Sequence, residues 1–108
     1  MNNSQKLKAH AIAQHYGYDG QARQTVEELS ELIQAICKER RYADVKTEDI
    51  ENDFNEYIAE EIADVEIMLE QLKWLLGCQR YVEEIIENKL LRQVRRIASE
   101  SNIDNRSD

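Results

Sequence analysis

The sequence contains no proline and only three glycines, and this scarcity of helix-breaking residues constrains the fold more than any other feature. Residues that favour helix, such as Ala, Leu, Ile, Glu and Gln, dominate the chain. We therefore expect an all-α protein. Because 108 residues bury only a small core, we also expect the chain to associate with further copies of itself, as a homodimer or a homotetramer.

Hydrophobic periodicity and capping residues predict four helices that form a bundle. Thr47 is the expected N-cap of the third helix, and Gly77 is placed to end that helix. The polar C-terminal segment has the composition of a disordered tail. The predicted helices cover about 3–16, 20–41, 48–76 and 79–98, with a break in the GYDG segment at 17–20, a loop at 42–49, a single domain over 1–98 and a tail over 99–108.

Charge and hydropathy exclude several classes of partner. The net charge of −8 opposes binding to a nucleic-acid polymer, which depends on clustered Lys and Arg. The N-terminus lacks the apolar core of a signal peptide, and no apolar run has the length that spans a membrane, so we expect a cytoplasmic protein. Cys37 and Cys78 lack CxxC spacing and are expected to be small buried residues, with a disulfide as the alternative.

The second predicted helix has an apolar stripe and a separate acidic face. Glu28 and Glu31 are three residues apart and therefore neighbours on the helix surface. A solvated face would explain this pair by itself. The stripe, expected to be core, contains Ala22, Val26, Leu29, Ile33, Ile36 and Cys37, and the other face contains Gln21, Gln24, Glu28, Glu31 and Ala35.

The third predicted helix repeats the acidic pairing with Glu61 and Asp64, but here an acid falls on the apolar side. A carboxylate buried there without a partner would cost several kcal/mol, so we expect a compensating group. Glu61 shares its face with Ile58, Val65, Met68 and Leu72, while Ala63, Ile67 and Trp74 lie on nearly the opposite side, where a second subunit is expected to cover them.

A divalent cation would turn the repulsion between these carboxylates into attraction. Oxygen ligands favour Mg²⁺, with Mn²⁺ as its substitute. His10 and His15 lie in the first predicted helix, away from both acidic pairs, which argues against di-iron and zinc sites. Lys89 and Arg92 share a face of the fourth helix with Arg96; a solvated face would explain them, but beside a metal site they would also suit a polyphosphate.

The segments EELSE at 27–31 and EIAD at 61–64 resemble the EExxE and ExxD motifs of the MazG-like all-α nucleoside triphosphate pyrophosphohydrolases, in particular the short single-domain forms of phages and prophages. The likeness runs from about Gln21 to Ile97 and includes the helix order. One departure is the long gap of 29 residues between Glu31 and Glu61, which puts the conformation of the linker in question.

The resemblance implies an enzyme that converts an NTP or dNTP to the monophosphate and pyrophosphate. Glu28, Glu31, Glu61 and Asp64 would then bind Mg²⁺, and Glu27 would be the base for the attacking water, with a plain surface acid as the alternative. Lys89 and Arg92 would bind phosphates, and Gln21 and Gln24 would contact the nucleotide unless they only begin a solvated helix. The competing hypotheses are a non-catalytic acidic interaction protein and a module that binds nucleotides without hydrolysing them.

Overall fold

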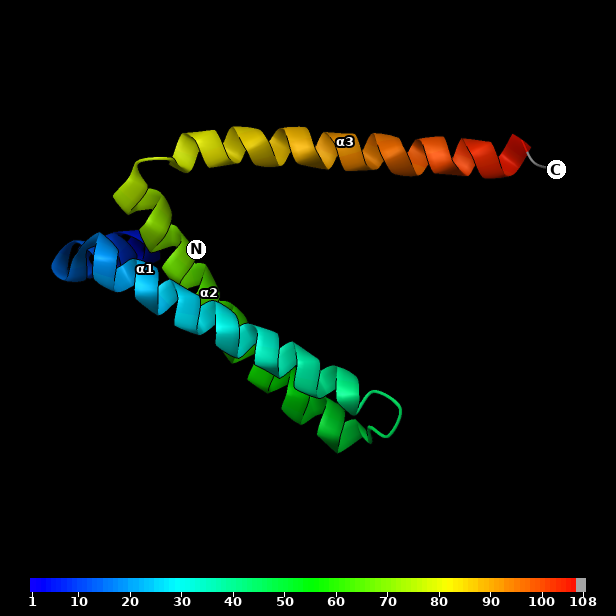
Figure 1. Ribbon diagram of the computed structural model, residues 1–108, viewed down its shortest axis with the longest axis horizontal. Coiled ribbons are helices and arrows are strands. Elements are labelled where there is room, and N and C mark those ends of the chain that lie inside the picture. Colours follow the sequence, from blue (N-terminus) through cyan, green and yellow to red (C-terminus); the bar gives the residue numbers. More distant parts are fainter. Residues whose placement is uncertain (107–108) are drawn as a thin grey trace. The chain divides into compact units, whose positions relative to one another are not determined.

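The computed structural model describes residues 1–106 and contains, within them, three helices and no strand (Figure 1). The predicted all-α class is therefore confirmed. The sequence predicts four helices; the first element of the structure spans the first two of them and is interrupted at Gly17, whose backbone is not helical. The helices are α1, Asn3–Arg41; α2, Glu48–Leu76; and α3, Gln79–Arg106.

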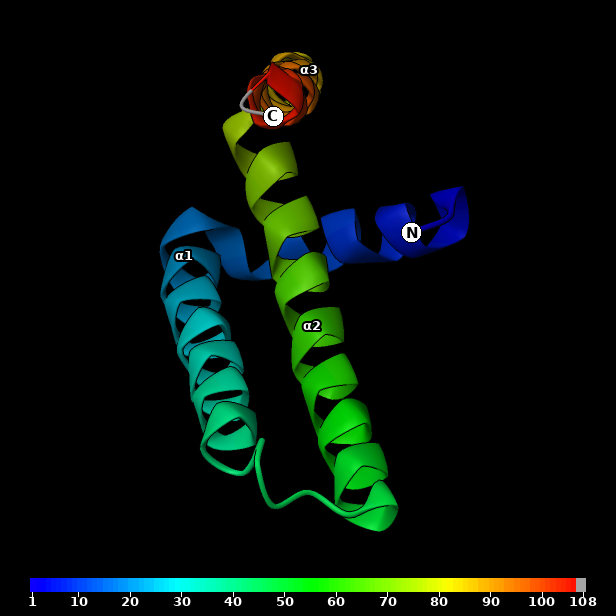
Figure 2. The same cartoon turned by 90° about the vertical axis from the view of Figure 1, so that its right-hand side faces the viewer.

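Gly17 bends α1 at the GYDG segment. Its φ of 82° and ψ of 172° are not helical, and this region of backbone space is open essentially to glycine alone. The segment of α1 before the bend crosses α2, whereas the segment after it runs antiparallel beside α2 (Figure 2). The helix begins with a reciprocal cap, in which Asn2 Oδ1 accepts from the Gln5 amide and Gln5 Oε1 accepts from the Asn2 amide.

The chain divides into two compact units, Met1–Gly77 and Cys78–Asp108, and the single domain over 1–98 stays a prediction. The first unit holds α1 and α2, and the second holds α3. Helix α3 extends past its expected end at Ala98 as far as Arg106. The last two residues of the expected tail, 107 and 108, lie outside the described residues.

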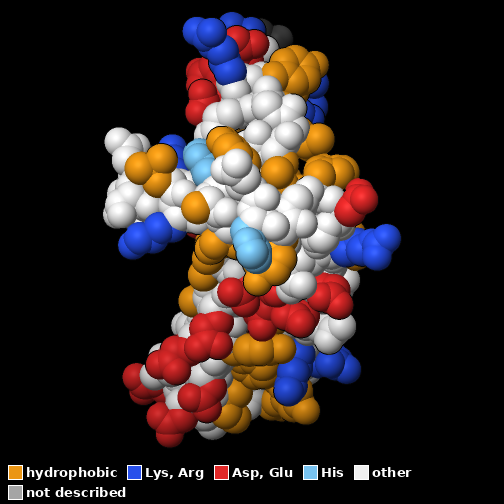
Figure 3. Space-filling model, turned by 90° about the vertical axis from the view of Figure 1, so that its left-hand side faces the viewer, with side chains coloured by type: hydrophobic (Ala, Val, Ile, Leu, Met, Phe, Trp, Pro, Cys, Tyr) orange, Lys and Arg blue, Asp and Glu red, His pale blue; other side chains and the backbone are white. Residues whose placement is uncertain are grey.

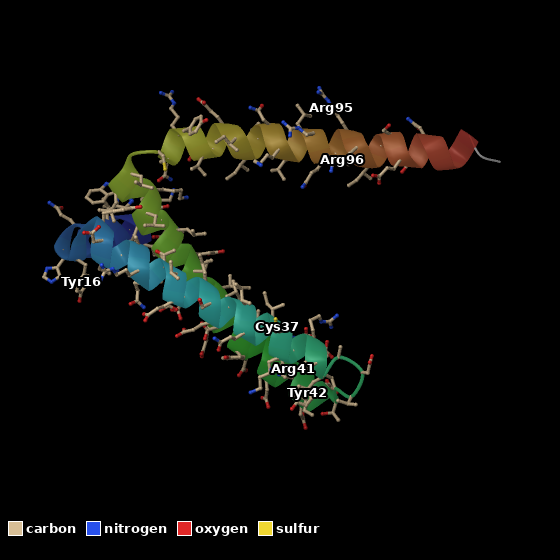
Figure 4. All side chains as sticks on the ribbon, viewed as in Figure 1. Tyr16, Cys37, Arg41, Tyr42, Arg95 and Arg96 are labelled. Atoms are coloured by element: carbon tan, nitrogen blue, oxygen red, sulfur yellow. The ribbon has the colours of Figure 1, made fainter. Side chains whose placement is uncertain are left out.

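The ends of α2 follow the sequence prediction. Thr47 caps the N-terminus by accepting from the Ile50 amide, and Gly77 ends the helix in the left-handed region with φ of 63°. In the turn before α2, Lys46 Nζ lies 2.6 Å from Glu39 Oε1. Tyr42, at the end of α1, has its ring centroid 6.0 Å from that of Phe54 (Figure 4).

The face of α1 that packs on α2 differs from the one predicted. Thr25 and Ala35 are buried, while Val26 and Ile33 of the predicted stripe are 64% and 62% exposed. Small side chains let the two helices approach closely. The face of α1 that contacts α2 is therefore different from the most hydrophobic face of α1. Cys37, also expected to be buried, is exposed, and neither cysteine forms a disulfide.

The predicted apolar face of α2 does pack against α1. Val65 and Met68 are buried, and Glu61 is half-buried beside them. The opposite set has a partner within the chain: Trp74 stacks on His10 with centroids 5.2 Å apart, and Ala63 and Ile67 line a hollow of about 410 Å³ against the first segment of α1. The first segment of α1 contacts this set, but Ile67 and Trp74 stay 40% and 39% exposed, so their cover by a second subunit stays a prediction.

Replacement of Gly17 by Ala is expected to lower the free energy of unfolding by about 1–3 kcal/mol, because alanine does not tolerate this backbone conformation. A new Cβ would have no heavy atom within 4 Å, so the cost is conformational and not a clash. The matched control is Gly20→Ala, where φ is not positive and the nearest atom is Tyr16 Cβ at 3.9 Å. Urea unfolding at equal protein concentration should show destabilisation in the first variant and a gain of about 0.4–1 kcal/mol in the second. Equal stabilities would contradict this role for Gly17.

Candidate metal site

Three glutamates converge where the second segment of α1 lies beside α2. Glu28 and Glu31 come from successive turns of α1, and Glu61 comes from the facing turn of α2. One carboxylate oxygen of each lies within 4.8 Å of the others. Figure 3 shows acidic side chains gathered over the unit that holds α1 and α2, with hydrophobic side chains between them. Helical spacing and antiparallel packing are therefore enough to assemble the three carboxylates.

Two of the three glutamates have an oxygen that is buried and unpaired. Oε2 of Glu28 and Oε2 of Glu61 are shielded from solvent and have no hydrogen-bond partner among the described residues. The other oxygen of Glu28 accepts from Gln24 Nε2 at 2.8 Å. An uncompensated buried carboxylate oxygen is costly, because it has given up water without gaining another donor. A cation bound between these oxygens would remove that cost.

Electrostatic repulsion within the cluster changes the pKa of the third glutamate, Glu31. The negative charge of Glu28 raises the pKa of Glu31 above its ordinary value, and partial desolvation and the charge of Glu61 act in the same direction. Glu31 itself is exposed, so solvent remains in reach of the cluster. Glu31 therefore holds its proton more tightly in the folded chain than in the unfolded one.

The chemistry of the cluster fits a hard divalent cation. All three groups are carboxylates, and Mg²⁺ and Mn²⁺ prefer oxygen ligands. Mg²⁺ is commonly held by one or two carboxylates together with water and substrate phosphates, so an open, half-exposed cluster suits it. No His or Cys belongs to this group of residues, which leaves zinc without its preferred ligands.

The other predicted acids lie outside this close group. Asp64, predicted as a fourth ligand, is exposed and is not one of the three converging carboxylates. Glu27, the candidate base, is also exposed. Their predicted roles remain predictions, since the structure positions only Glu28, Glu31 and Glu61 together.

The two glutamines that were predicted to contact the nucleotide lie in different environments. Gln24 is exposed and donates to Glu28, so it orients a member of the cluster. Gln21 is buried, and its Nε2 donates to Gln71 Oε1 at 2.6 Å across the helix pair. A contact from Gln21 to a nucleotide would require that buried bond to open.

The predicted phosphate-binding residues belong to the second unit. Lys89 and Arg92 are exposed on α3, one turn apart. Two further arginines, Arg95 and Arg96, follow on the same helix (Figure 4). Their participation in the site remains a prediction.

Sequence reasoning missed a second polar cluster near the bend of α1. Glu70 is only 4% exposed, and its Oε2 lies 2.8 Å from His10 Nε2, while Lys73 Nζ is 3.6 Å from its Oε1. A sequence separation of 60 between His10 and Glu70 hides this contact from any local pattern. It depends on the bend at Gly17, which sends the first segment of α1 across α2.

Comparison with known proteins gives no match: a scan against protein-family models, a search of curated proteins and a search of solved structures each found none. No helix among residues 1–106 combines the length and hydropathy that crossing a membrane requires. The geometry of the site and the motif resemblance therefore carry the functional argument.

Replacement of Glu31 by Gln is expected to stabilise the metal-free protein at neutral pH. The pKa of Glu31 is raised by folding, so the folded state holds this proton more tightly; the associated stability is present below pH about 4.5 and is lost as pH rises through the raised pKa. The glutamine side chain does not ionise, so the variant does not lose this stability as the pH rises. Its melting temperature in EDTA should exceed that of the wild type at pH 7, and the difference should shrink toward pH 4.

The control for this measurement is Glu27→Gln, which removes one negative charge from the same helix outside the close group. A similar gain in both variants would assign the effect to overall charge. It would contradict specific repulsion within the cluster.

Proposed function

We propose that this chain is a Mg²⁺-dependent nucleoside triphosphate pyrophosphohydrolase, which adds water across the α–β phosphoanhydride of an NTP or dNTP. The products are the nucleoside monophosphate and pyrophosphate. The observation that carries the proposal is the convergence of Glu28, Glu31 and Glu61 with two buried carboxylate oxygens left unpaired. Mn²⁺ is expected to substitute for Mg²⁺ because it accepts the same oxygen ligands.

The close group supplies the primary metal ligands in this proposal. Glu28 and Glu61 each carry an oxygen that is already shielded from solvent, and Gln24 donates to the other oxygen of Glu28. Asp64 is assigned as a further ligand by the motif. Bound Mg²⁺ would polarise the phosphoryl oxygens and lower the pKa of the attacking water.

The remaining roles concern the substrate and the proton. Glu27 accepts the proton of the attacking water, for which its exposure gives it solvent access. Lys89 and Arg92 bind the phosphates and neutralise charge on the departing pyrophosphate. Gln21 is assigned to the nucleotide with Gln24, subject to release from Gln71.

The motif resemblance supports this reaction over other uses of a metal site. EELSE at 27–31 supplies Glu27, Glu28 and Glu31, and EIAD at 61–64 supplies Glu61 and Asp64, in the order and helical setting of the MazG-like enzymes. The antiparallel pairing of α1 and α2 brings residues of both motifs together despite the long linker between them. As in the sequence argument, the active form is proposed to be a homodimer or homotetramer.

The competing function is a non-catalytic interaction or nucleotide-binding module. The observation that favours it is that, within the first unit, large hydrophobic side chains of α1 such as Val26 and Ile33 stay exposed beside α2. Such a module would need no cation at the acidic cluster. The two functions therefore differ in their response to divalent metal.

The test is release of pyrophosphate from a panel of common and oxidised NTPs and dNTPs, in Mg²⁺, in Mn²⁺ and in EDTA. Glu61→Gln is expected to abolish metal-dependent turnover, by a factor of about 10² or more, because it removes a ligand charge while keeping the size of the side chain. Glu66→Gln, an exposed acid on the same helix outside the cluster, is the matched control and should remain active. A silent wild type, with helical circular dichroism intact, would instead favour the module.

A further inference from the structure

Two glutamines form a buried hydrogen bond between the helices of the first unit. Gln21, on the second segment of α1, and Gln71, on α2, are 7% and 1% exposed, and Gln21 Nε2 donates to Gln71 Oε1 at 2.6 Å. Thr25 adds a second buried bond, in which its Oγ1 donates to the Gln21 carbonyl at 2.7 Å. Burial of an amide is tolerated where it is hydrogen-bonded, so each glutamine depends on its partner across the helix pair.

The glutamine bond shares one lengthwise alignment, or register, with the acidic cluster. The second segment of α1 runs antiparallel to α2, so a step forward along one helix matches a step backward along the other (Figure 2). Glu31 lies ten residues after Gln21 on α1. Glu61 lies ten residues before Gln71 on α2. The bond between the glutamines and the convergence of the glutamates therefore belong to the same register of the helix pair.

The apolar pattern of the contact does not determine that register by itself. The less exposed positions recur every three or four residues on both helices, which is the heptad pattern of paired helices. A shift of α2 by seven residues along α1 would keep this pattern, but it would place Phe54 or Met68 where Glu61 now lies. On α2 these positions include Phe54, Ile58, Glu61, Val65, Met68 and Leu72.

The buried glutamines distinguish between these registers. In either shifted register the two side chains would no longer contact each other, and a buried amide without a partner costs more than the hydrogen bond itself gains. A single buried polar residue fixes the register of some coiled coils at a cost in stability. The turn between the helices is the other restraint, because Lys46 binds Glu39 there and Tyr42 lies near Phe54.

We propose that the hydrogen bond between Gln21 and Gln71 fixes the register of α1 against α2 in which the three glutamates converge. The two glutamines are positioning residues, which act on the acidic cluster through the alignment of the helices. The register itself does not require a cation, whereas the effect on cation binding rests on the proposed function. A nucleotide contact by Gln21 would open the bond, so the test uses nucleotide-free protein.

The test replaces both glutamines by methionine, Gln21→Met with Gln71→Met, which keeps the length of the side chains and removes the hydrogen bond. Spin labels on the native Cys37 and on Leu76→Cys, in a Cys78→Ser background, report the register by double electron–electron resonance in EDTA. Both label sites are exposed. The labels lie about 30 Å apart along the helix pair, and a slip of seven residues changes that separation by about 10 Å.

Labelled protein that keeps both glutamines should give one distance, whereas the methionine variant should add a second population shifted by about 10 Å. The matched control is Thr25→Val, which removes a buried hydrogen bond within α1 and leaves the bond between the helices in place. The control should keep the single distance. An unchanged distance in the methionine variant would overturn the proposal and assign the register to the turn. An equal shift in Thr25→Val would overturn it as well.

Cation binding separates the failure of this proposal from the failure of the proposed function. Excess Mg²⁺ should return the methionine variant to the wild-type distance, because it favours the register in which the glutamates converge. The apparent Kd of the variant for Mn²⁺ should rise in inverse proportion to the fraction of molecules in that register. A second population that does not respond to Mg²⁺ would support the register role and contradict the metal site.

Circular dichroism checks that the variants fold. The account assigns the bond to the choice of register and not to folding, so the methionine variant should keep its helical signal. Gln21→Leu with Gln71→Leu is the second apolar pair for the same distance measurement. Loss of the helical signal in both pairs would overturn the proposal.

Discussion

The contact between α1 and α2 places like charges together at a packed interface, and the candidate function depends on how that repulsion is resolved. Glu28 and Glu61 occupy half-buried positions where a purely structural helix pair would carry aliphatic side chains. Their buried oxygens have neither water nor donor, and their charges raise the pKa of Glu31 beside them. A bound cation would relieve this repulsion, and for that reason we propose a metal site here.

The bend at Gly17 determines what else the helix pair can do. It directs the first segment of α1 across α2, where His10 pairs with the buried Glu70 and stacks on Trp74. The second segment is then left to pack against α2 along one face only. Within the first unit, Val26 and Ile33 remain exposed on this segment.

The sequence predicted the features that depend on local chemistry. The absence of proline indicated an all-helical chain, Thr47 and Gly77 were correctly identified as the ends of α2, and the GYDG segment marked the bend. The position of Glu61 on the packing face of α2 also followed from periodicity. These predictions succeed because capping, glycine conformation and helical phase involve residues close together in the chain.

The features that sequence reasoning missed depend on which surfaces meet. Periodicity identified the apolar stripe with Val26 and Ile33 but assigned it to the core, whereas Thr25 and Ala35 form the face against α2. An apolar stripe shows that a face needs cover and does not specify whether the same chain or another copy provides it. The contact of His10 with Glu70 was missed for the same reason, because it also depends on which surfaces meet. Gln21 was predicted to contact the nucleotide, whereas in the structure its side-chain amide donates to Gln71.

The central claim, that the converging glutamates bind a divalent cation, is tested most directly by titrating the protein with Mn²⁺ and following free Mn²⁺ by electron paramagnetic resonance. The account predicts that the wild type depletes the free signal at a defined stoichiometry per chain, and that Mg²⁺ in excess restores it. Glu28→Gln and Glu61→Gln should each weaken binding by a factor of about 10 or more, whereas Glu66→Gln should not. Equal binding by the wild type and both cluster variants, or none by any of them, would contradict it.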